Sequence, residues 1–515
     1  MHRNWKAITY NLPIKDWYYD STSQWTLDYP PLFAAFEFVL AQVASLLNLH
    51  ETLNLTDSEV RHDSTVAYQK FTVIVSDFAY YYAIYEFCRA LEPIIQVRSN
   101  KTKKNDPAKS AYALKDLDLY QAFVRPSRVT MVALVLTLQP GLLLVDHVHF
   151  QYNGFLTSIL LLSMTCVIRR RYASGCFWFA LLLNFKHIYL YYAPGYGMYF
   201  ISSYCMHKRK SVNRVGSFIR RTLGLGFIVV IVFVITYAPF ADIDTLKQIL
   251  SRLFPFKRGL THAYWAPNVW SLYNTADKIL ATLTKHTLKA KFDLESISKS
   301  SSTSGLVQEY EHQYLPSIRP LTTLCLVGLF TAPLVMRFLL KTNVTSSVLF
   351  LKGITIAAFT SFMFGWHVHE KAIILVTIPL AAAAFMDRNL HNVLLRLTLA
   401  GTYSLLPLLF RPAEYVTKVT ILIASYCFLK SLKPSDEKRS TSLYNRLDNL
   451  YTTLIILVEI YITLFHHLIL SKYNFLPLML VSSSSAIGLT ASYLELYYDF
   501  MSRDVEEDAA AAAAA

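Results

Sequence analysis

Charged residues are scarce in this sequence of 515 residues, where they make up 16% of the chain. Soluble globular domains carry about a quarter. Hydrophobic residues reach 54%, and long runs without charge recur along the chain. This composition excludes a disordered chain, a coiled coil and an ordinary cytosolic enzyme. It predicts an all-α membrane protein that crosses the bilayer many times.

Motifs for disulfide, zinc and nucleotide chemistry are also missing. The six cysteines lie in or beside apolar runs and none forms a CxxC pair, so buried thiols are expected in place of a zinc site or a disulfide framework. No Walker loop or GxGxxG motif occurs, so no nucleotide-binding domain is expected. No repeat of fixed period is present either.

The apolar runs predict about 13 transmembrane helices. They lie near residues 68–92, 127–145, 152–168, 174–189, 190–205, 222–240, 319–340, 345–364, 371–387, 391–410, 415–431, 449–471 and 475–496. With this count the four most basic loops share one face, which an excess of Lys and Arg assigns to the cytosol. The net charge of +14 then reflects membrane topology, and nucleic acid is not an expected partner.

Three regions follow from this topology. Residues 1–67 form a lumenal segment, in which 30–48 are either a further span or an interfacial helix. Residues 68–496 form the transmembrane domain, with a large lumenal loop at 241–318, and residues 497–515 form a low-complexity tail. The polar lumenal start has no span to carry it across the membrane, so we expect one N-terminal span to be missing from this sequence.

Polar side chains gather in the lumenal loops beside the span ends, and ionisable groups at membrane depth suggest a site. Asp28 and Tyr29 form the first group, although Asp28 could instead cap the helix that begins at the following prolines. Asp146, His147, His149 and Gln151 form the second, in DHVHFQYN. That group suits proton transfer, and a metal site or simple helix capping are the alternatives.

Three further groups carry positive charge or imidazoles. Lys186 and His187 interrupt an apolar stretch, where a lysine must snorkel or meet an anion. Basic and aromatic residues alternate in the block that includes Lys257, Arg258, His262 and Trp265, which suits a phosphate or a solvated basic loop. The motif WHVHEK supplies donors for an anionic headgroup at a helix start, from Trp366, His367, His369, Glu370 and Lys371.

Together these groups suit a lipid-linked phosphate donor and a carbohydrate acceptor. The motifs LDYPP, DHVHFQYNG, KHIYLYYAPGYG, SRLFPFKRGLTHAYWAPN and WHVHEKAI resemble the dolichyl-phosphate-glucose α-1,3-glucosyltransferases of the endoplasmic reticulum. The resemblance extends over essentially the whole chain to about residue 500. Within this family, the third, fourth and fifth motifs resemble the members that add the second glucose more closely than those that add the first.

The resemblance implies a multispan fold of the GT-C type in the endoplasmic reticulum membrane, with the active site facing the lumen. It implies transfer of glucose from dolichyl phosphate glucose to Glc1Man9GlcNAc2-PP-dolichol, with inversion at the anomeric carbon. Inversion needs one base to deprotonate the acceptor hydroxyl. The expected partners are these two membrane lipids, with no cofactor, no nucleotide and no metal.

The resemblance also implies roles for single residues. The favoured base of the family is an acid shortly before the HRNW stretch, which here directly follows Met1, so within this sequence Asp28 or Asp146 would have to serve. His369 is the expected contact of the donor phosphate, helped by Lys371, Lys257, Arg258 and Lys186. Tyr29, Trp265 and Trp366 are expected to pack on sugar or lipid, and the other site candidates are His147, His149, Gln151, His187, His262, His367 and Glu370.

Three other functions remain open from the sequence. The first is the first-glucose transferase, which acts on the unglucosylated Man9 oligosaccharide. The second is a transporter of lipid-linked sugars, although transporters place their polar groups near the membrane midplane in inverted repeats. The third is a non-catalytic, truncated form of the enzyme.

Overall fold

The computed structural model describes residues 1–57, 62–104, 127–207, 214–254, 259–262, 264–288, 312–340, 346–432 and 443–502. Within these ranges the regular structure is helical, and the one β-type contact is an isolated bridge between Thr261 and Val368. The prediction of an all-α protein is confirmed. The predicted large lumenal loop and the C-terminal tail lie partly outside the described residues.

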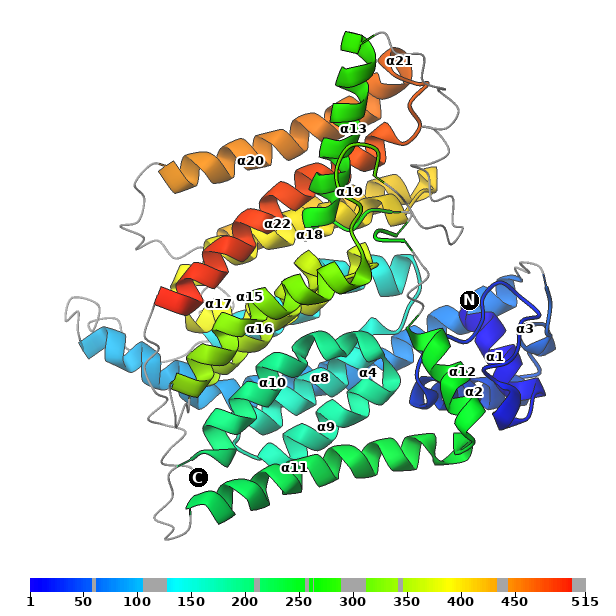
Figure 1. The fold of residues 1–515 in the computed structure, drawn as a ribbon, viewed down its shortest axis with the longest axis vertical. Helices are drawn as coiled ribbons and strands as arrows, with labels where there is room; N and C mark the ends of the chain where they lie inside the picture. The colour runs from blue at the N-terminus through cyan, green and yellow to red at the C-terminus, as the bar shows by residue number, and fades with distance from the viewer. Residues whose placement is uncertain are drawn as a thin grey trace, which may run out of the picture.

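Long helices lie side by side in two groups, as the ribbon shows (Figure 1). The first group comprises α4 (Asp63–Lys104), α8 (Asn153–Ile168), α9 (Tyr172–Phe185), α10 (Ala193–Phe200) and α11 (Arg214–Tyr237). The second comprises α15 (Pro320–Leu340), α16 (Ser347–Phe364), α17 (Ile374–Met386), α18 (His391–Leu405), α19 (Tyr415–Ser431), α20 (Leu443–Ile460) and α22 (Leu476–Ser502).

Helix α16 joins the two groups, because it contacts α10 on one side and α15, α17 and α22 on the other. Gly195 allows the close approach of α10. A Cβ atom there would lie 2.8 Å from the Cα atom of Ile354 on α16. All the residues of α16 except its last are buried, so this helix forms the centre of the bundle.

By length and composition, five stretches of the described chain are able to cross a membrane. They are Arg128–Val148, Arg214–Phe240, Pro320–Leu340, Ser347–Phe364 and Asn445–Ile469. Every predicted span falls on a helix, but several of these helices are short, and the count of thirteen stays a prediction. Cys325 and Cys427 are exposed on α15 and α19, so the expectation of buried thiols is wrong for these two residues.

The first candidate span changes its geometry where it approaches the site. Helix α6 (Arg128–Thr137) is followed by Gln139 and Pro140, then by α7 (Pro140–Leu142) and the π-helical turn η3 (Leu143–Val148). Proline lacks the backbone N–H of a helix interior. The side chain of Gln139 replaces the lost contacts, because its oxygen accepts from the N–H of Leu142 at 2.9 Å and its nitrogen donates to Thr377 at 2.6 Å. Asp146 and His147 lie on the π-helical turn η3, which follows the segment that Gln139 holds.

Four helices gather at one end of the bundle (Figure 1): α1 (His2–Asn11), α2 (Pro31–Leu46), α3 (His50–Leu53) and α12 (Ile243–Leu253). Lys6 on α1 forms a buried ion pair with Glu37 on α2, with 2.7 Å between Nζ and Oε2. Asp242 is the N-cap of helix α12, and its carboxylate accepts a hydrogen bond from the N–H of Thr245 at 3.0 Å. The N-cap of helix α2 is Pro30, and no side chain caps this helix. Asp28 therefore does not cap it.

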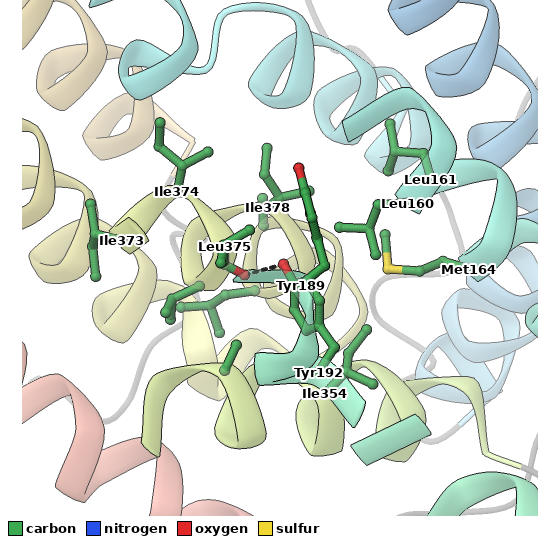
Figure 2. Close-up of a cluster of buried hydrophobic side chains, with 14 of the residues drawn as sticks. Leu160, Leu161, Met164, Tyr189, Tyr192, Ile354, Ile373, Ile374, Leu375 and Ile378 are labelled. Carbon is green, nitrogen blue, oxygen red and sulfur yellow. Dashed lines mark hydrogen bonds between the residues drawn. The ribbon is translucent and has the colours of Figure 1, made fainter. Parts of the chain in front are cut away.

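An apolar cluster packs where the 3₁₀ helix η4 (His187–Tyr192) meets α8, α16 and α17 (Figure 2). Tyr189 and Tyr192 lie among Leu160, Met164 and Ile354 in this cluster. The hydroxyl of Tyr192 donates to the carbonyl of Leu375 on α17. This contact fixes η4, which directly follows Lys186, against the helix that follows Lys371.

A second buried charge cluster ties α16 to the ends of α17 and α22. The ammonium of Lys352, which is fully buried, lies 2.6 Å from Asp387 and 2.5 Å from Asp499. Removing one partner from a buried ion pair leaves an uncompensated charge and costs about 3–5 kcal/mol.

We therefore expect Lys352→Met to lower the free energy of unfolding by about 3–5 kcal/mol, measured by thermal unfolding in detergent. Lys247→Met is the matched control, because Lys247 pairs with Asp244 at 3.0 Å on an exposed surface, and such pairs contribute at most about 1 kcal/mol. Equal unfolding midpoints for the two variants would contradict a structural role for Lys352.

Candidate functional site

Two adjoining cavities open beside the N-terminal helices. The larger has a volume of about 840 Å³ and the smaller about 510 Å³. Their linings share Met1, Trp25 and Lys371. Both volumes lie within the usual range of small-molecule sites, about 300–1,000 Å³.

The larger cavity brings together most of the residues that the sequence singled out. They come from the segment before α2, from the turn after α9, from the segment after α12 and from the loop after α16. The predicted residues in its lining are Asp28, Tyr29, Lys186, His187, His262, Trp366, His367, His369 and Lys371.

Asn153 holds Lys186 in place at this cavity. The ammonium of Lys186 donates to the side-chain oxygen of Asn153 at 2.9 Å and lies 5.0 Å from the centre of the Tyr29 ring. The nitrogen of Asn153 in turn donates to Asp146 at 2.8 Å and to Gln151 at 3.0 Å. Asp146 therefore orients the amide whose oxygen faces the lysine.

Asp146 itself is 2% exposed and lies in neither lining. Its second oxygen accepts from the N–H of Gly154 at 2.6 Å, which is an amide in the first turn of α8. His147 lies apart from the cavities and pairs with Asp77, with 3.3 Å between Nε2 and Oδ2. The neighbouring residues His149 and Gln151 line the smaller cavity. Asp146 thus acts here as a capping and orienting group.

Two loops meet at the far wall of the larger cavity. The ring of His367 donates to the carbonyl of Gly259 at 2.7 Å, and its backbone N–H donates to Leu260 at 2.9 Å. His367 has a φ of 51°, a left-handed conformation that few residues other than glycine adopt. These contacts bring His262 against His369, with 4.1 Å between the ring centres.

His262, His369 and Glu370 form a group that has the composition of a metal site. One ligand atom from each lies within 4.8 Å of the others. Glu370 is 2% exposed, and its Oε2 lies 4.0 Å from Nδ1 of His262. Burial raises the pKa of Glu370 above its usual range, against the attraction of Lys371. The rings of His262 and His369 and the buried carboxyl group of Glu370 therefore lie together at this wall.

Trp265 lies away from both cavities. Trp265 is 4% exposed and packs against Phe475, with 4.9 Å between the rings and the ammonium of Lys278 at 5.0 Å. It is absent from both described linings. Lys257 and Arg258 lie outside the described residues.

A family comparison decides between the chemical classes that this geometry allows. The model of the ALG6, ALG8 glycosyltransferase family matches residues 1–496. The chain belongs to this family.

Individual members of the ALG6, ALG8 family match over nearly their full length. A mouse protein is 39% identical over 504 residues, covering 96% of this chain and 90% of the mouse protein. A protein from Gibberella zeae is 40% identical, covering 97% and 93%. One from Arabidopsis thaliana is 37% identical, covering 96% and 91%. Each is named dolichyl pyrophosphate Glc1Man9GlcNAc2 alpha-1,3-glucosyltransferase. This chain is a glycosyltransferase, and the resemblance stated from its motifs is confirmed.

Several residues of the two linings were not assigned from the sequence. Arg252, which belongs to the motif SRLFPFKRGLTHAYWAPN, lines the larger cavity. The smaller cavity is built largely from side chains to which the sequence assigned no role. The unassigned side chains of the smaller cavity belong to segments far apart in the chain, and no single motif connects them. These side chains are Arg3, Asn4, Gln69, Lys70, Arg411 and Glu414.

The two predicted carboxylates occupy different environments, so their variants should differ. Asp28→Asn is expected to lower kcat for glycosyl transfer about 10²- to 10⁴-fold, because a general base contributes that much. Asp146→Asn is expected to lower the unfolding midpoint, with a smaller loss of kcat per folded enzyme. Kinetics and thermal unfolding of both purified variants test this.

Full transfer by Asp28→Asn would exclude Asp28 as the base. Loss of kcat in Asp146→Asn at an unchanged unfolding midpoint would instead assign the role to Asp146.

Proposed function

We propose that this chain transfers glucose from dolichyl phosphate glucose to Glc1Man9GlcNAc2-PP-dolichol and forms an α-1,3 bond. The observation that carries this proposal is the larger cavity, where Lys186, Arg252 and Lys371 gather with four imidazoles beside apolar walls. The proposed acceptor is the one that the names of the relatives specify. A cavity of this composition suits an amphiphilic phosphate.

The donor phosphate lies near His369, Lys371 and Lys186. Lysine ammonium groups stabilise phosphate as point charges, and the imidazole of His369 adds a hydrogen bond. The lipid of the donor follows the apolar part of the lining, which includes Leu253, Ile374 and Leu375. Tyr29 and Trp366 offer aromatic faces beside the glucose.

The reaction is a single displacement. The acceptor hydroxyl attacks C1 of glucose from the face opposite the phosphate, and the new C–O bond forms as the bond between C1 and the phosphate oxygen breaks. The hydroxyl proton passes to the base, for which Asp28 is the described carboxylate in the larger lining. Dolichyl phosphate leaves with the electron pair, and nearby cations stabilise its growing charge.

This reaction takes place at the lumenal face of the endoplasmic reticulum membrane. The apolar helices suit a membrane protein, and the basic loops of the sequence support this orientation. Asn54 lies in the glycosylation sequon Asn-Leu-Thr and is exposed near the smaller cavity, where Arg3 contacts its backbone oxygen at 2.7 Å. An exposed sequon at this end fits a lumenal position.

The acceptor assignment is tested in cells that lack the enzyme adding the second glucose. Expression of this chain is expected to convert the accumulated Glc1 lipid-linked oligosaccharide to the Glc2 species, measured by profiling the released glycans. Lys371→Ala should convert less at equal expression, because the phosphate loses its nearest cation. Conversion of Man9 to Glc1 in cells that lack the first-glucose enzyme would contradict the proposal.

We further propose that transfer needs no metal and no cofactor. The lysines and Arg252 already supply positive charge to the cavity, and burial raises the pKa of Glu370, which opposes its ionisation as a metal ligand. The purified enzyme is therefore expected to keep its full rate after EDTA treatment and desalting. Loss of the rate, with recovery on adding Mn²⁺ or Zn²⁺, would instead assign a metal to His262, His369 and Glu370.

A further inference from the structure

The smaller cavity shares Lys371 with the donor site, and its other side chains take no part in the donor chemistry described above. Its walls come from the first turn of α1, the start of α4, residues 148–151 and the loop between α18 and α19. That loop contains two 3₁₀ helices, η9 (Leu406–Leu408) and η10 (Pro412–Glu414). A cavity built by four separate segments, with a volume of about 510 Å³, is large enough for a ligand.

The lining of the smaller cavity is rich in side chains that form hydrogen bonds. Asn4, Gln69, Arg411 and Glu414 offer amides, a guanidinium and a carboxylate, which together donate and accept hydrogen bonds in several directions. Phe410 is 75% exposed in the same loop. Arg3 and Lys70 add two further hydrogen-bond donors. Such a surface suits a ligand with many hydroxyl groups and apolar ring faces, which is the chemistry of a carbohydrate.

Asn4 supplies an independent sign of a missing partner. It is 1% exposed, and its side-chain nitrogen donates to the carbonyl of Trp25 at 3.1 Å. Its side-chain oxygen is buried and has no hydrogen-bond partner among the described residues. Leaving such an acceptor unsatisfied is unfavourable, because the group loses its hydrogen bond to water without gaining another. A hydroxyl group in the smaller cavity would satisfy it.

The two cavities meet at Met1, Trp25 and Lys371. A ligand in the smaller cavity therefore reaches the place where Lys371 faces the donor. We propose that the smaller cavity binds the oligosaccharide of the acceptor and presents its terminal sugar to the donor at this junction. This inference rests on the proposed function. It assigns the smaller cavity to the oligosaccharide of the acceptor and not to its lipid.

The test is steady-state kinetics of the full chain with a short-chain lipid-linked Glc1Man9GlcNAc2 acceptor. Gln69→Ala and Arg411→Ala should each raise the KM for this acceptor roughly three- to tenfold, the effect of losing one hydrogen bond. The donor KM and kcat should stay unchanged. Arg411 is exposed and Gln69 is partly exposed, so both variants should fold, as size-exclusion chromatography will check.

Gln96→Ala is the matched control, because Gln96 is an exposed glutamine on the same helix α4 and lies in neither lining. It should leave both KM values unchanged. If the wild type converts the Glc1 acceptor but Gln69→Ala and Arg411→Ala raise the donor KM, or change neither KM, the cavity assignment is wrong. If the wild type fails to convert this acceptor, the proposed function itself is wrong.

Discussion

The placement of the site depends on the buried ion pair between Lys6 and Glu37. Both side chains are 0% exposed. Glu37 also accepts from His2 at 2.6 Å, and burial lowers the pKa of His2 to about 4, so its imidazole is neutral at pH 7. Removing either charged partner would strand the other in a dry interior. The pair therefore fixes α1 against α2, and Asn4 and Trp5 then hold the following segment through the carbonyls of Trp25 and Thr26.

The same constraint shapes the rest of the cavity wall. Buried polar groups need partners, and several groups at this wall find them in one another. Asn153 joins Asp146 to Lys186, while His367 ties two loops through Gly259. Beneath them, the apolar cluster of Figure 2 fixes η4 through the contact of Tyr192 with Leu375. The contacts of Asn153 and His367 thus hold the cationic side chains at the cavity, next to the apolar cluster that fixes η4.

Much of this arrangement could be predicted from sequence. The motifs around Lys186 and His369 did meet in one cavity, since both follow apolar runs at the same end. The environment of Asp146 could not be predicted, because it depends on a π-helical turn. The span count stays undecided for a similar reason. Apolar composition alone does not separate a central helix from a peripheral one. The candidate span Ser347–Phe364 is almost wholly buried inside the protein, whereas Asn445–Ile469 is mostly exposed on its surface.

The separation of the two cavities constrains the chemistry more than any single residue does. If donor and acceptor occupy different cavities, their reacting atoms must meet where the linings join, near Lys371 and Trp25. Lys371 then stabilises the leaving phosphate, so no strong general acid is required. A base must reach the same place from the opposite side of the sugar ring. Asp28 belongs to the same short segment as Trp25, so if Asp28 is the base, the contacts that fix α1 also set its distance from the leaving group.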